Sequence, residues 1–91
     1  MQRKEYDIII KIVAEGKEPC HADHKVGDEW IFKGPTPDGL CSTAYNSIYP
    51  MAWALKYGAT FPWQEDPDVM ITSCPDPKVN IVFELRRIPK E

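Results

Sequence analysis

Strict alternation of side-chain character between Tyr6 and Val13 constrains the fold of this chain more than any other feature. One side of this segment is wholly apolar, and it carries Tyr6, Ile8, Ile10 and Ile12. A period of two in residues that are largely β-branched predicts a strand with one buried face. A single strand cannot cover that face by itself, so other elements of the 91-residue chain must pack against it.

Three further segments show strand patterns. A short strand is predicted over Trp30–Phe32, between turn-forming residues on both sides. A second covers Val69–Ser73 and is cut off by Pro75. The third is clearer, because alternate apolar residues share one side, namely Val79, Ile81, Phe83 and Leu85.

One segment has the period of an amphipathic helix, and its apolar stripe consists of Ala44, Ile48, Met51 and Leu55. Ser42 or Thr43 is the expected N-terminal cap, and Gly58 suits the C-terminal end. Pro50 lacks the N–H that would bond within the helix. The pattern therefore predicts a kinked helix, or two short helices with Pro50 opening the second.

The predicted order is strand, short strand, helix, strand, strand, with no repeated βαβ unit. We therefore expect a single α+β domain over residues 1–91, with one kinked helix packed on a face of a small, mainly antiparallel sheet. Large aromatic side chains are expected to fill much of its core, namely Trp30, Trp53, Trp63 and Phe83.

Composition argues against several classes of protein. Lys and Arg number 11 against 14 Asp and Glu, a net charge of −3, so neither a nucleic acid nor a membrane is an expected partner. The apolar run after Tyr6 is broken by Lys11, too early for a secretion signal. Three cysteines, an odd number, favour reduced thiols over a disulfide framework. These features predict a cytoplasmic protein.

Several separated motifs occur in a familiar order: Gly27-Asp28-Glu29-Trp30, Pro37-Asp38-Gly39-Leu40-Cys41, Ile48-Tyr49-Pro50, Phe61-Pro62-Trp63 and Cys74-Pro75-Asp76. The pattern resembles a family of small single-domain proteins of anaerobic bacteria and archaea whose function is uncharacterised. The likeness runs from about Cys20 to Ile88. It implies a reduced cytoplasmic setting and one domain, and it supplies no reaction and no catalytic residue.

The cysteines all lie at the boundaries of predicted elements. Three thiolates and one imidazole form a tetrahedral site for a soft metal such as zinc or iron, or part of an iron–sulfur site. The sequence predicts such a site from Cys20, His21, Cys41 and Cys74. No CxxC pair is present, so ordinary packing of small cysteine side chains is the alternative. His24 lies in the same polar loop and is expected to be solvated.

Cys41 alone supports a different interpretation. A thiol just before a helix N-terminus is stabilised as the thiolate, which is the nucleophilic form. His21 or His24 could then serve as its base, which would make the protein a cysteine-dependent enzyme.

In the segment around Phe61 and Trp63, two aromatic residues flank a proline. These rings form either a platform for a partner or a lid over the core. Tyr45, Tyr49 and Trp53 repeat at a spacing of four and are interpreted as a second packing stripe of the helix.

Taken together, the residues favour a small cytoplasmic binding or accessory module that acts on a protein or small ligand. Its functional surface is expected where the three cysteines approach one another beside the aromatic segment. A cysteine-dependent enzyme, and a plain interaction domain or homodimer, remain the alternatives.

Overall fold

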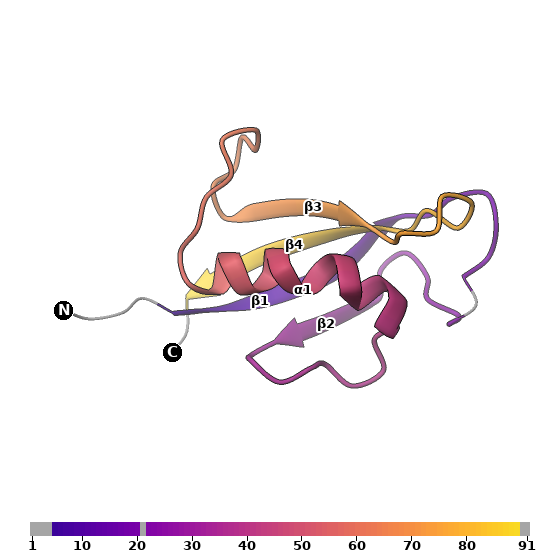
Figure 1. Cartoon of the computed structure of the whole chain (residues 1–91), viewed down its shortest axis with the longest axis horizontal. Coiled ribbons are helices and arrows are strands. Elements are labelled where there is room, and N and C mark those ends of the chain that lie inside the picture. Colours follow the sequence, from indigo (N-terminus) through magenta and orange to yellow (C-terminus); the bar gives the residue numbers. More distant parts are fainter. Residues whose placement is uncertain (1–4, 21, 90–91) are drawn as a thin grey trace.

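The computed structural model describes residues 5–20 and 22–89, which form a four-stranded antiparallel sheet with one helix across it (Figure 1). Neighbouring strands follow the order β2-β1-β4-β3. The elements are β1 (Tyr6–Ala14), β2 (Glu29–Phe32), α1 (Ser42–Lys56), β3 (Val69–Ser73) and β4 (Val82–Pro89). This arrangement confirms the predicted α+β fold.

The two longest strands, β1 and β4, form the centre of the sheet. Ile10 lies opposite Leu85, and Tyr6 lies opposite Pro89, so the first and last strands run side by side over nearly their whole length. The apolar side of β1 packs beneath α1, because its alternate residues Ile8, Ile10 and Ile12 are fully buried.

The core lies between the helix and one face of the sheet, and its largest fully buried side chains are Phe32, Phe83, Ile8, Ile10, Ile12, Ile48, Leu55 and Leu85. Of the four aromatic residues expected in the core, Phe83 is fully buried and Trp30 is half-buried. The expectation is wrong for Trp53 and Trp63, which are exposed. Trp53 projects from the outer side of α1, whereas its neighbour Ala52 faces the core.

Helix α1 is one continuous element from Ser42 to Lys56, so the two-helix alternative is wrong. Pro50 lies inside it at an exposed position, where water can reach the carbonyl of Asn46 that Pro50 leaves without a helical donor. Neither predicted N-terminal cap, Ser42 or Thr43, is used, because Cys41 is the N-cap residue and its side chain makes no capping bond.

Strand β4 begins three residues later than the pattern predicted. Val79 and Ile81 are buried as expected, but they lie in the connection that precedes the strand. The inward-facing residues of β4 are therefore Phe83, Leu85 and Arg87.

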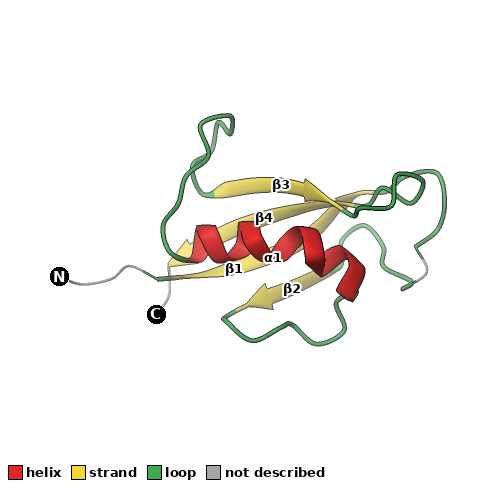
Figure 2. Cartoon of the chain, viewed as in Figure 1, coloured by secondary structure: helices red, strands yellow, loops and turns green. Residues whose placement is uncertain are grey.

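Figure 2 shows α1 on one face of the sheet. The opposite face carries a mixture of charged and apolar side chains, including Lys11, Glu84 and Ile71. An antiparallel sheet tolerates such a face in water because its residues alternate. Within the described part of the chain, no helix has the length and apolar character needed to cross a bilayer.

Candidate functional site

All three cysteines lie at one end of the sheet, which we call the thiol end. Strand β1 runs toward this end, β3 finishes there and α1 begins there, which brings Cys20, Cys41 and Cys74 to the same side of the molecule (Figure 1). Each is a free, half-buried cysteine that packs against the core. The topology thus gathers residues that are far apart in the sequence.

For the predicted metal site to form, the ligands must lie close enough to bind one ion, and not only at the same end of the molecule. Among residues 5–20 and 22–89, no three His, Cys, Asp or Glu side chains are placed to hold a metal ion. The predicted ligand His21 lies outside the described residues. A site formed by Cys20, His21, Cys41 and Cys74 therefore stays a prediction.

His24 is buried, with only 8% of its surface exposed, so its expected solvation is wrong. The backbone N–H of Cys41 donates to Nε2 of His24 at 3.0 Å. The imidazole also meets the ring of Trp30 edge to face, with centroids 4.8 Å apart. The N–H groups of a helix start have no partner within the helix. His24 supplies an acceptor at this junction from a distant loop.

This hydrogen bond fixes the chemistry that His24 can perform. A neutral imidazole has one nitrogen that accepts and one that carries the proton. Because Nε2 accepts from Cys41, the proton lies on Nδ1. Nδ1 therefore has no lone pair for a metal, and Nε2 is not available as a base for the Cys41 thiol. The bond rules against His24 both as a metal ligand and as a general base.

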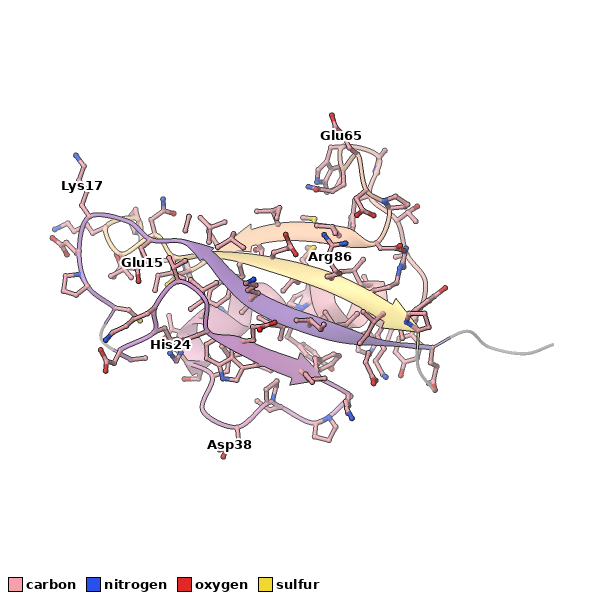
Figure 3. All side chains as sticks on the ribbon, turned by 180° about the vertical axis from the view of Figure 1, so that it is seen from behind. Glu15, Lys17, His24, Asp38, Glu65 and Arg86 are labelled. Atoms are coloured by element: carbon pink, nitrogen blue, oxygen red, sulfur yellow. The ribbon has the colours of Figure 1, made fainter. Side chains whose placement is uncertain are left out.

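A cavity of about 540 Å³ opens beside Cys20 and His24, within the connection between β1 and β2. Ile81 forms part of its wall and accepts a bond from the backbone N–H of Cys74 at 2.8 Å. Charged residues of both signs line much of the rest, namely Glu15, Lys17, Glu18, Asp23 and Lys25. Figure 3 shows Lys17 pointing away from the body of the protein.

The two connections at the thiol end are held against each other by backbone bonds. Gly16 donates to the carbonyl of Val79 at 2.9 Å, and Glu18 donates to that of Lys78 at 3.3 Å. A Cβ atom on Gly16 would collide with the carbonyl of Val79, which explains a glycine at this position. The cysteine-bearing loops thus share a common support.

The loop of residues 57–68, which we call the aromatic loop, leaves from the opposite end of the molecule (Figure 1). Trp63 is 65% exposed, whereas Phe61 is half-buried against the core, and their ring centroids are 5.4 Å apart. The platform interpretation therefore fits Trp63, and Phe61 supports it. The expectation that this loop lies beside the cysteines is wrong, because the 15 residues of α1 hold the two regions about 22 Å apart.

Arg87 fastens the base of the aromatic loop. Its side chain is only 5% exposed, and it donates to the carbonyls of Leu55, Ala59 and Pro67 at 3.2, 2.8 and 2.7 Å. Its Nε pairs with Asp68 at 3.0 Å. Sequence reasoning missed this role. The alternation of Phe83 and Leu85 continues to Arg87, and a buried arginine must find several acceptors.

A more exposed ion pair lies beside this network. Arg86 contacts Asp66 at 3.2 Å and Glu84 at 3.3 Å. The pKa of Asp66 is lowered, first by the hydrogen bond from the Asp68 backbone N–H and then by Arg86. The pKa of Arg86 is raised by the same pair.

The outer side of α1 is aromatic rather than charged. Tyr49 and Trp53 are exposed and Tyr45 is half-buried, so the predicted second packing stripe holds only at its first position. Burial raises the pKa of Tyr45. The one charged residue of α1, Lys56, is buried and donates to the carbonyl of Tyr6 at 3.3 Å.

No known family model, curated protein or solved structure matches this chain. The resemblance to the family from anaerobic bacteria and archaea therefore stays a prediction. The functional argument has to be made from the residues and their geometry.

Proposed function

We propose that this protein is a small non-enzymatic binding module that holds a soft metal ion, such as zinc or iron, at the thiol end. The ligands in this proposal are Cys20, His21, Cys41 and Cys74. One observation carries it: three free, half-buried cysteines lie at the same end of the molecule, although 20 residues separate Cys20 from Cys41 and 32 separate Cys41 from Cys74.

Thiolates and imidazoles are the ligands that zinc prefers, in sets of four around a tetrahedral ion. Half-buried thiols suit this role, because they are held by the core and can still be reached from solvent. The cavity beside Cys20 supplies an entrance at this end of the molecule.

The fixed tautomer of His24 makes the proposal specific. His24 is committed to Cys41, so the imidazole ligand must come from His21. Replacing His21 should therefore weaken metal binding. Replacing His24 by Gln, whose side-chain oxygen can still accept from Cys41, should leave metal binding intact.

The first test is elemental analysis of protein purified without oxygen, followed by cobalt(II) titration of the metal-free protein. We expect about one equivalent of bound metal and a thiolate–cobalt absorption band. His21→Ala and Cys74→Ser should each lower the affinity at least tenfold, with His24→Gln as the matched control. Less than about a tenth of an equivalent of any transition metal, with no cobalt band, would overturn the proposal.

A second candidate is a cysteine-dependent enzyme, favoured by the position of Cys41 as the N-cap residue of α1. Its base would be His21, since His24 is engaged. This candidate predicts that Cys41 is alkylated much faster than Cys20 and Cys74 near neutral pH. Equal, slow alkylation of all three thiols would argue against it.

A further inference from the structure

Strand β3 is an edge of the sheet, with β4 on one side and no strand of the described chain on the other. A backbone hydrogen bond joins β3 to β4 just beyond each end of β3. The N–H of Arg87 donates to the carbonyl of Asp68, and the N–H of Cys74 donates to the carbonyl of Ile81, each at 2.8 Å. Residues of an antiparallel pair bond to the neighbour at every second position. Met70 and Thr72 therefore bond to β4, and Val69, Ile71 and Ser73 direct their backbone groups outward.

These outward groups can be counted individually. The N–H of Val69 is already used, because it donates to the carbonyl of Asp66 at 3.2 Å. The N–H groups of Ile71 and Ser73 have no acceptor within residues 5–20 and 22–89, and the carbonyls of Val69, Ile71 and Ser73 have no donor there. The edge thus offers two donors and three acceptors.

Apart from the carbonyl of Ser73, this set of groups is complementary to itself. In an antiparallel pairing centred on Ile71, the two Ile71 residues exchange N–H and C=O bonds in both directions. The N–H of Ser73 then lies opposite the carbonyl of Val69 in the second copy, and the reverse pair is equivalent by symmetry. The N–H of Val69 bonds to Asp66 instead, so the carbonyl of Ser73 opposite it in the second copy receives no bond from β3.

Strand β3 also lacks the usual protection of an edge. Natural edges carry charges, prolines or bulges that prevent pairing with another chain. The five residues of β3 contain no charge and no proline, and Ile71 is 39% exposed. The other edge strand, β2, carries Glu29, and the connection that follows it runs alongside (Figure 1).

The aromatic loop leads into the N-terminal end of β3, and its tip extends beyond the β3 edge of the sheet (Figure 1; Glu65 marks the tip in Figure 3). In the antiparallel pairing this end meets the Ser73 end of the second copy. Trp63 is then available to pack against the neighbouring chain. Its ring adds apolar area to an interface that a five-residue strand alone would leave small.

We propose that two copies of this chain associate through β3, in antiparallel register about Ile71, and so join two four-stranded sheets into one continuous sheet. Both α1 helices then lie on the same face. This proposal does not depend on the metal site, because β3 takes its partner through backbone groups.

Sedimentation velocity, in a buffer with a chelator and a reductant, tests this association up to about 1 mM protein, the range in which small interfaces form. We expect the mass to rise from 10.4 kDa toward twice that value. Ile71→Lys should abolish the rise, because it places like charges opposite each other across the symmetry axis. Ile31→Lys is the matched control, since Ile31 is 52% exposed on the same sheet face of β2.

Amide hydrogen exchange supplies a second measurement that needs no variant. The amides of Ile71 and Ser73 should exchange at least tenfold more slowly at high protein concentration, whereas the outward amide of Ile31 should not change. A single 10.4 kDa species at every concentration, or a dimer that Ile71→Lys leaves intact, would overturn the proposal.

Discussion

At both the thiol end and the aromatic loop an irregular segment is fixed to the sheet, but the two regions are fixed by different kinds of interaction. The thiol end relies on backbone bonds between two loops and on bonds from backbone N–H groups to side chains, such as the bond from Cys41 to His24. The aromatic loop is fixed mainly by one buried side chain, Arg87, with acceptors on the loop and on α1.

This difference indicates how each region could bind a ligand or partner. At the thiol end, the three thiols form no disulfide, so a ligand can be added to them without breaking the hydrogen bond between Cys41 and His24. At the aromatic loop, the bonds of Arg87 hold a frame from which Trp63 projects. A projecting ring on a fixed base loses little freedom when it binds.

The largest effect is expected from Arg87→Ala. Removing this side chain leaves the carbonyls of Ala59 and Pro67 without donors, takes from the Leu55 carbonyl one of its two donors, and frees the base of the aromatic loop. The free energy of unfolding should therefore fall by about 3 kcal/mol. Arg87→Lys keeps the charge but not the forked geometry and should lose about half as much. Urea denaturation measures both. A loss below about 1 kcal/mol for the alanine variant would show that the loop does not depend on Arg87.

A smaller effect is expected from His24→Ala. It removes the acceptor of the Cys41 N–H and the contact with Trp30, at a cost of about 1–2 kcal/mol. His24→Gln should recover part of this loss, because its oxygen can accept the same bond. Equal stability of the alanine and glutamine variants in urea would show that the contact with Trp30, and not the hydrogen bond, fixes the loop.

The smallest effect is expected at Asp66. Its pKa is lower in the folded state than in the unfolded chain, so the carboxylate stabilises the fold above its unfolded pKa, and this contribution is lost as the pH falls through the folded pKa. Thermal unfolding from pH 7 down to acid pH should show a slightly steeper fall for the natural protein than for Asp66→Asn. High salt should reduce the difference, since the pair with Arg86 is exposed.

Much of the fold could be predicted because side-chain periods are local. The alternation after Tyr6 and the four-residue spacing from Ala44 to Ile48 each appear within a few residues and identify β1 and α1. Strand β3 was predicted over its full extent, Val69–Ser73. The start of β4 was not, because buried apolar residues such as Val79 look alike in a tight connection and in a strand.

The candidate site could be predicted only in part, because its decisive contacts join distant segments. That the cysteines gather at one end follows from their places at element boundaries. Nothing near His24 in the sequence indicates that it accepts a bond from Cys41, 17 residues later. Likewise, the acceptors of Arg87 lie 19 to 32 residues away, beyond the reach of any local pattern.

The pairing of Tyr6 with Pro89 has a practical consequence for any larger assembly. The chain enters and leaves the fold at neighbouring points, both remote from the cysteines (Figure 1). A tether, label or fused protein attached before Tyr6 or after Pro89 therefore departs from one pole, and the cysteine-bearing pole stays unobstructed. The domain can thus be anchored to a surface, or inserted within another polypeptide, with its proposed metal-binding pole facing outward.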